Sequence, residues 1–334
     1  ASNNTAVGRS ALLANTTGSY NTALGNSAGA SVTTGTNNTL IGGLAGDALT
    51  DSDRNVAVGF YALTTDTLGQ FNTAIGFGAL QTQNFATATN SYNTAVGYSS
   101  GLSVTTGINN TLIGGLAGDS LTTGGDNVAI GYEALSTEDA HGSSVAVGMR
   151  ALKAQNAGAH SYNVAVGKGA GQVVTTGIYN TFIGGQSGDA NTTASNNTAV
   201  GYASLGANTT GTRNVAVGTN TLDANTTGSY NTAFGYDSLG ANTTGTFNSA
   251  FGDSALTVNT TGTQNIAVGH SALIANTTGG LNVAVGLAAL NANTTASNNT
   301  AIGTSALTAN TTGSNNTALG TFALDKTTTG SFNT

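Results

Sequence analysis

A short motif, Asn-x-Ala-Val-Gly or a close variant, recurs along the whole chain at an almost constant spacing of 17 residues. The first copy begins at Asn4, the second at Asn21 and the last complete one at Asn316. A unit this short cannot enclose a core alone, so neighbouring units must stack to bury their apolar side chains. We therefore interpret residues 1–334 as one repeat array of about nineteen coils, a fragment of a longer fibre. Two coils are longer than the rest, at 72–92 and 144–162.

Each unit is numbered here from its Asn, which is position one. Position three is Ala in most units, position four is always apolar, and position five is always Gly. Position nine is Leu in thirteen units and Gly in six. Many units end in Thr-Thr-Gly followed by Ser or Thr. These constraints fall at different places within one period, which indicates an ordered coil and argues against disorder despite the low charge.

The unit predicts a coil of two strands joined by two turns. Asn-Thr-Ala-Val-Gly has the length and the β-branched content of a five-residue strand, with positions two and four on one face and position three on the other. The segment around position nine should return as a second short strand. The position-five glycines should end the first strand where the turn needs a positive φ or a close backbone approach. We expect this structural role for Gly8, Gly25, Gly42, Gly59, Gly76, Gly97, Gly114, Gly201 and Gly320.

Compensating volume changes predict a densely packed interior. The six position-nine glycines form adjacent pairs, and the second unit of each pair has a larger residue at position three. Five of the six units also carry an apolar residue at position twelve. Volume lost at one site is regained at its neighbours, as close packing requires. The larger position-three residues are Leu40, Leu112 and Phe182.

A single column of such coils buries few large side chains, so we expect additional stabilisation. Asn, Thr and Ser ladders between coils are one source. Several chains packed side by side are another, and the small Ala at position three suits a face that another backbone approaches closely.

Composition excludes several classes of function. The chain has only 7 basic and 14 acidic residues, no basic stripe and no apolar run long enough to span a membrane. It has no Cys and only three His, and no recurring set of nucleophile, base and acid. We therefore expect no enzyme activity, no catalytic residue, no cofactor, no metal site, no nucleic-acid partner and no membrane span in this segment.

The repeat resembles the head repeats of YadA-like trimeric autotransporter adhesins and related repeat arrays of phage tail fibres. The likeness rests on Asn-[Thr/Ser/Val]-[Ala/Val]-[Val/Ile/Leu]-Gly followed by an Ala-Leu return segment, and it covers the whole chain. The resemblance implies a left-handed parallel β-roll, a homotrimeric fibre and an extracellular location on a cell surface or virion. The unit is longer here than in the adhesin heads, and the extra residues fall in the Thr-Thr-Gly turn.

Exposed aromatic residues and the longer coils are the candidate contact sites for a host-surface receptor or glycan. Aromatic rows beside the strands could stack on sugars, or they could only cover the backbone of the turns. The insertions could form protruding contacts, or they could be inert spacers. The candidate contact residues are Phe85, Tyr92, His160, Tyr162, Tyr98, Tyr132, Tyr202 and Tyr236.

Two weaker patterns have a plain structural alternative. The Gly-Asp segments near Asp47, Asp119 and Asp189 suggest calcium-binding β-rolls, but each supplies one carboxylate and a simple turn explains them. Asn-x-Thr sequences such as Asn208-Thr209-Thr210 permit N-glycosylation, but turn chemistry is the favoured explanation.

The leading functional hypothesis is an adhesive fibre segment, either an adhesin head or stalk or a tail-fibre shaft. A purely structural filament or spacer is the main alternative. Ice binding by Thr rows is a third, weakened because the Thr-Thr-Gly turn is frequently interrupted, for example at Asp66 and Ala140.

Overall fold

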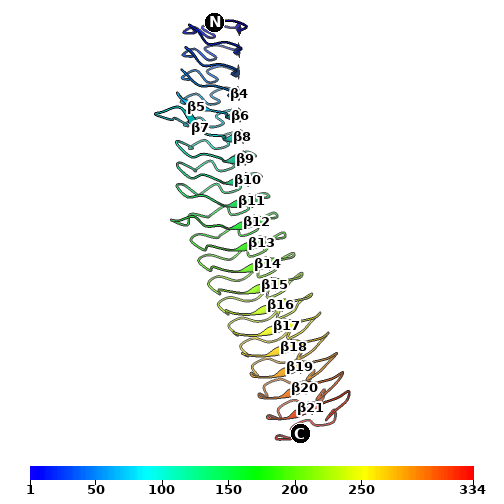
Figure 1. Ribbon diagram of the computed structural model, residues 1–334. Helices are drawn as coiled ribbons and strands as arrows, with labels where there is room; N and C mark the ends of the chain where they lie inside the picture. The colour runs from blue at the N-terminus through cyan, green and yellow to red at the C-terminus, as the bar shows by residue number, and fades with distance from the viewer. The chain divides into compact units, whose positions relative to one another are not determined.

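The computed structural model describes all 334 residues and is all-β, a parallel β-solenoid of about nineteen coils. The predicted fold class is therefore confirmed. The coils fall into two compact units, Ala1–Lys168 and Gly169–Thr334. Within each unit the chain winds as a column of stacked coils, each contributing one strand to a parallel sheet (Figure 1). The structure contains no helix that is long and apolar enough to cross a membrane.

In the first unit each coil contributes one three-residue strand to the main sheet, and two further strands form a small sheet of their own. The main strands are β1 (Thr5–Val7), β2 (Thr22–Leu24), β3 (Thr39–Ile41), β4 (Val56–Val58), β6 (Thr73–Ile75), β8 (Thr94–Val96), β9 (Thr111–Ile113), β10 (Val128–Ile130), β11 (Val145–Val147) and β12 (Val164–Val166). The small sheet pairs β5 (Gly69–Gln70) with β7 (Thr89–Asn90).

The second unit repeats the same coil without insertions. Its strands are β13 (Thr181–Ile183), β14 (Thr198–Val200), β15 (Val215–Val217), β16 (Thr232–Phe234), β17 (Ser249–Phe251), β18 (Ile266–Val268), β19 (Val283–Val285), β20 (Thr300–Ile302) and β21 (Thr317–Leu319).

Within each unit, successive strands of the main sheet pair in parallel and in register. In the first pair Ala6 lies opposite Ala23, and in the second unit Ala233 lies opposite Ala250. Each sequence position therefore forms a file that runs from coil to coil within its unit. The strand covers positions two to four only, so the predicted five-residue strand is too long. It ends early because Gly at position five leaves the extended conformation.

The return segment is not a second strand, and this part of the prediction is wrong. It is a series of turns because positions seven and nine both adopt left-handed backbone angles, as at Tyr61 (φ 61°) and Leu63 (φ 53°). Backbone bonds still join successive coils there, for example from the N–H of Leu63 to the carbonyl of Ala79 at 3.0 Å. Left-handed angles are costly for a residue with a Cβ. We infer that buried packing and these bonds maintain them.

The position-five glycines are required for two separate reasons, which confirms their predicted role in the turn. Gly235 has φ +130°, and a Cβ added there would lie 2.4 Å from the carbonyl oxygen of Gly252 in the next coil. Gly8 shows the same arrangement, with φ +130° and a distance of 2.4 Å to the Gly25 oxygen. A side chain would therefore be strained by its own backbone and would separate neighbouring coils.

The interior of each coil lies between position three of the strand and positions eight and nine of the return segment. Ala233 of the strand and Leu239 of the return segment are both fully buried. We expected position three to face another chain, and the structure contradicts this. Its side chain points into the coil because the return segment folds back over that face, so the small Ala leaves space for Leu at position nine.

The expected exchange of volume between neighbouring positions is confirmed. A Cβ at Gly29 would lie 2.6 Å from Cδ1 of Leu40, and one at Gly46 would lie 2.8 Å from Cδ2 of the same residue. A Cβ at Gly188 would lie 2.4 Å from Cε1 of Phe182. The enlarged position-three residue thus occupies the space that Leu at position nine fills in other coils.

Buried asparagines at position one join successive coils in both units, and a second asparagine ladder at position twelve runs through the second unit, as predicted. At position one, the Oδ1 of Asn231 accepts from the backbone N–H of Asn248 at 3.0 Å. At position twelve, the Nδ2 of Asn259 donates to Oδ1 of Asn242 at 3.0 Å and to the carbonyl of Gly262 at 3.1 Å. Because these polar atoms are buried and paired, a narrow column with few large apolar residues can remain closed.

Candidate interaction surface

The outer face of the strands carries a continuous file of apolar side chains at position four, which we call the outer file. In the first unit the outer file consists of Val7, Leu24, Ile41, Val58, Ile75, Val96, Ile113, Ile130, Val147 and Val166. In the second it consists of Ile183, Val200, Val217, Phe234, Phe251, Val268, Val285, Ile302 and Leu319. Alternation along the strand places this position outside because position three points inward.

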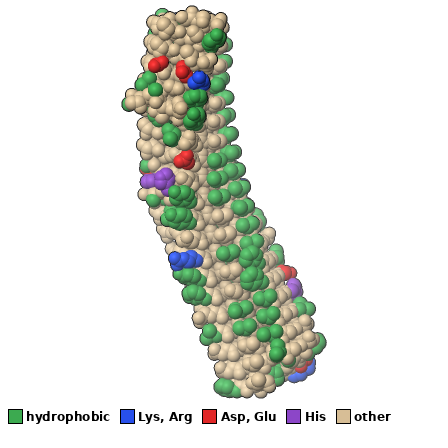
Figure 2. All heavy atoms as spheres, in the orientation of Figure 1, with side chains coloured by type: hydrophobic (Ala, Val, Ile, Leu, Met, Phe, Trp, Pro, Cys, Tyr) green, Lys and Arg blue, Asp and Glu red, His purple; other side chains and the backbone are tan.

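The outer file is partly exposed over both units. Ile75 is 38% exposed in the first unit, and Phe251 is 40% exposed in the second. The rings of Phe234 and Phe251 stack at 5.3 Å with an interplanar angle of 8°. Figure 2 shows hydrophobic side chains following one another from coil to coil on the surface of each unit. Contiguous apolar surface of this kind is typical of an interaction site.

Most aromatic candidates from the sequence lie at the surface. Tyr98, Tyr132, Tyr202 and Tyr236 are between 47% and 60% exposed, and Tyr92 is 52% exposed. Their exposure agrees with the prediction, while their role in contact remains a prediction.

The ring faces of several surface aromatics are already occupied. Phe77 stacks on Phe60 at 6.0 Å and on Tyr98 at 5.6 Å. The Tyr132 and Tyr202 rings lie beside glycines of the preceding coil, 3.5 Å and 3.6 Å from where a Cβ of Gly115 and Gly185 would stand. These rings shield turn backbone or one another. This arrangement favours the structural interpretation of the aromatic rows over sugar stacking.

A second aromatic row, at position seventeen, begins with an arginine in both units. Arg54 lies over the ring of Phe71 at 5.1 Å, and Phe71 stacks on Tyr92 at 5.1 Å. In the second unit Arg213 lies over Tyr230 at 5.2 Å, and Tyr230 stacks on Phe247 at 4.8 Å. Cation–π and ring contacts of this kind brace successive turns against one another.

The two longer coils extend sideways beyond their neighbours, near β5 and β7 and between β11 and β12 (Figure 1). Phe85 of the first insertion is only 5% exposed, so its prediction as an exposed contact residue is wrong. The extra residues fold back, pair through β7 and place this ring inside. His160 and Tyr162 of the second insertion are exposed, and their rings lie 6.1 Å apart.

Charged groups near the second insertion form a local network. Glu133 accepts from Lys153 at 2.6 Å and from Arg150 at 2.9 Å. The hydrogen bond from Lys153, followed by that from Arg150, lowers the pKa of the Glu133 carboxyl. The three side chains join adjacent coils, and at this partly exposed site such a network contributes modestly to stability.

Position twelve holds a buried glutamine in each longer coil and a buried acid in the coil before it. Asn is the most frequent residue at this position. The Nε2 of Gln83 donates to Asp66 at 2.7 Å, and the Nε2 of Gln155 donates to Glu138 at 3.1 Å. The sequence pattern did not lead us to expect either acid inside the coil. Their burial could have been predicted from their place at position twelve, which is Asn or apolar in most coils.

The structure places the residues of both weaker sequence patterns. Asn208 is fully buried, and its Nδ2 donates to Asn191 and to the Gly211 carbonyl at 2.9 Å each. Its amide is thus engaged inside the fold, which supports the structural interpretation of this sequence. Asp47, Asp119 and Asp189 lie in separate coils, and none belongs to a group of three side chains placed to hold a metal.

The fold and surface define this chain as a β-solenoid repeat protein with an apolar outer strand face. No protein-family model and no curated protein matches the chain.

Proposed function

We propose that this chain is a structural and adhesive segment of an extracellular fibre whose copies associate through the outer file. The observation that carries the proposal is that position four is apolar in every coil and remains partly exposed in the isolated chain. An apolar file on the outer face contributes nothing to the interior of the coil. Covering it with a second chain would remove this surface from water, at about 25 cal/mol for each Å² buried.

Three copies around a common axis are the assembly we propose, and the support for this number is the resemblance to trimeric adhesin head repeats. Each copy would present its parallel strands to the others, while the turns and the longer coils would face outward. The exposed His160 and Tyr162 would then remain accessible to a receptor or glycan on a host surface.

Sedimentation equilibrium of the purified full chain tests the assembly. We expect three times the chain mass for the wild type, and loss of the trimer when Phe234→Glu and Phe251→Glu place charge on the outer file. Tyr236→Glu and Phe247→Glu are the matched control, because these aromatics are 57% and 54% exposed in the same region but lie outside the outer file. A stable wild-type monomer at micromolar concentration would refute the assembly.

A spacer without receptor contact is the second candidate, favoured by the occupied faces of the aromatic rings. Deletion of residues 214–264 removes three whole coils and joins Arg213 to Asn265 in register. Binding of the labelled chain to glycan-coated and protein-coated surfaces should fall in this variant if the coils contribute to adhesion. Unchanged binding would identify those coils as a spacer. A wild-type chain that binds no surface would refute the adhesive role and leave the assembly intact.

A further inference from the structure

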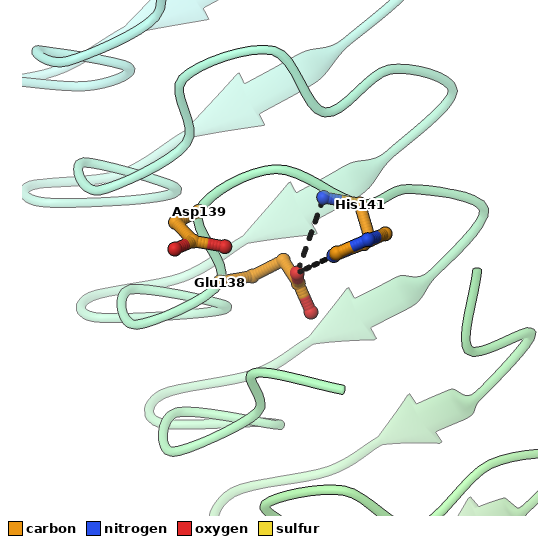
Figure 3. A group of neighbouring side chains, drawn as sticks. All are labelled: Glu138, Asp139 and His141. Carbon is orange, nitrogen blue, oxygen red and sulfur yellow. Dashed lines mark hydrogen bonds and ion pairs between the residues drawn. The ribbon is translucent and has the colours of Figure 1, made fainter. Parts of the chain in front are cut away.

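Three potential metal ligands gather in one turn of the coil that begins at Asn127. Glu138, Asp139 and His141 each offer a ligand atom, and these atoms lie within 4.8 Å of one another. Figure 3 shows the Glu138 carboxylate and the His141 ring facing one another, with Asp139 beside them in the same turn. The group combines one imidazole with two carboxylates, a donor set used by divalent transition metals.

The Glu138 carboxylate is buried and only weakly satisfied. Its side chain is 1% exposed, and it accepts from the His141 backbone N–H at 3.3 Å and from the Nε2 of Gln155 at 3.1 Å. Both bonds are long for a charged acceptor. A buried carboxylate usually pairs with a cation or coordinates a metal, since an uncompensated charge is costly away from water.

The imidazole points a free nitrogen at this carboxylate. The Nδ1 of His141 is buried, has no hydrogen-bond partner and lies 3.7 Å from Oε1 of Glu138. That gap exceeds a hydrogen bond. It is close to the roughly 3.3 Å that separates two ligands of a tetrahedral metal at bond lengths of about 2.0–2.1 Å.

The chain contains an internal comparison 72 residues earlier. There Asp66 and Gly69 occupy the places of Glu138 and His141, and Thr67 occupies that of Asp139. Asp66 accepts from Gln83 at 2.7 Å, from the Gly69 N–H at 3.0 Å and from the Phe85 N–H at 3.4 Å. One copy of the turn thus satisfies its buried acid with hydrogen bonds. The other has fewer and longer bonds, an imidazole whose Nδ1 has no hydrogen-bond partner, and a second carboxylate.

We propose that Glu138, Asp139 and His141 bind a divalent transition-metal ion, with Zn²⁺ as the representative species. Glu138 and His141 supply the inner ligands, and rotation of the exposed Asp139 side chain supplies the third. Water completes the tetrahedral shell on the open side, where the His141 side chain is 30% exposed and gives the ion access. A bound metal ion would cross-link the side chains of the turn that directly precedes the second longer coil. Its proposed role is to stabilise this turn.

Isothermal titration of the full chain with ZnCl2 tests the site. We expect one ion per chain, and affinity about tenfold lower or worse in His141→Gly and in Asp139→Thr, since even the loss of a supporting residue commonly has this effect. Both substitutions install the residues found at Gly69 and Thr67, so the turn has a precedent for folding without the ligands. A CaCl2 titration should show no comparable binding, because Ca²⁺ prefers all-oxygen sites.

His270→Ser is the matched control, because His270 and Asp253 form an exposed pair at 3.5 Å with only two ligands. Its zinc affinity should equal that of the wild type. Circular dichroism of every variant checks that the coils remain folded. Absence of zinc binding in the wild type would overturn the proposal, and so would affinity unchanged in both His141→Gly and Asp139→Thr.

Discussion

The Nε2 of Gln83 donates a 2.7 Å hydrogen bond to Oδ2 of Asp66, and both side chains are completely buried between neighbouring coils. This pair stands at position twelve, where Asn is the most frequent residue along the chain. A carboxylic acid thus occupies the interior of a protein that has only 14 acidic residues. Its ionisation should make the stability of the first unit depend on pH.

Burial raises the pKa of Asp66 above its ordinary value of 3.8, and the hydrogen bonds from Gln83 and the backbone offset only part of this effect. The folded chain therefore holds more protons than the unfolded chain from about that pH up to the raised pKa. The free energy of unfolding should fall as the pH rises through this window and stay low above it.

Asp66→Asn removes the buried charge, so we expect a higher melting temperature than the wild type at pH 7 and no difference near pH 3. Thermal melts across this range provide the measurement. Asp126→Asn, at an exposed carboxylate, controls for the change in net charge. A variant that is less stable than the wild type at pH 7 would show that the hydrogen bonds of Asp66 outweigh its desolvation.

Gly235→Ala should destabilise the coil by more than about 2 kcal/mol, because the strained backbone and the contact with the next coil add together. Gly158→Ala is the matched comparison, since Gly158 has φ +67° and nothing lies within 4 Å of an added Cβ. We expect about 1 kcal/mol there, from the left-handed backbone alone. Denaturant midpoints of the two variants provide the measurement, and equal losses would refute the role of the close approach between coils.

Phe182 and Gly188 should behave as one packing unit. Phe182→Ala leaves a cavity that should cost about 3–5 kcal/mol. Gly188→Leu places a side chain where Cε1 of Phe182 lies 2.4 Å from the added Cβ, so it should also be strongly destabilising. The double variant restores the Ala and Leu found in most coils, so its loss should be much smaller than the sum. Additive losses in a double-mutant cycle would contradict this coupling.

Asn259→Ala should interrupt the position-twelve ladder at three hydrogen bonds, two donated by its Nδ2 and one accepted from Asn276 at 2.8 Å. The unpaired buried partners should cost about 2–3 kcal/mol. Asn291→Ala is the control, because Asn291 is only partly buried and makes one bond of 3.5 Å. Hydrogen exchange of the flanking coils should rise locally in Asn259→Ala, and an effect no larger than that of Asn291→Ala would discount the ladder.

The sequence by itself determined the period, the stacking of successive units and the strand-ending turn. Gly at position five recurs in every unit because no other residue combines that backbone angle with the close approach of the next coil. The exchange of volume between Leu40 and the neighbouring glycines was also readable, since a filled interior ties each residue to its neighbours in space. Because the unit recurs along the whole chain, a residue pattern that is found in many units is not expected to arise by chance.

Only the tertiary structure decided which side of the strand is the interior. Positions three and four are both apolar, and alternation places them on opposite faces without saying which face is covered. The return segment covers one of the two faces, and its course depends on left-handed backbone angles at residues such as Tyr61 and Leu63. The conformational preferences of Tyr and Leu do not predict these angles. The burial of Phe85 and the grouping of Glu138 with His141 could not be predicted from the repeat pattern either. Phe85 lies within an insertion that breaks the register, and the contact between Glu138 and His141 depends on the conformation of one turn.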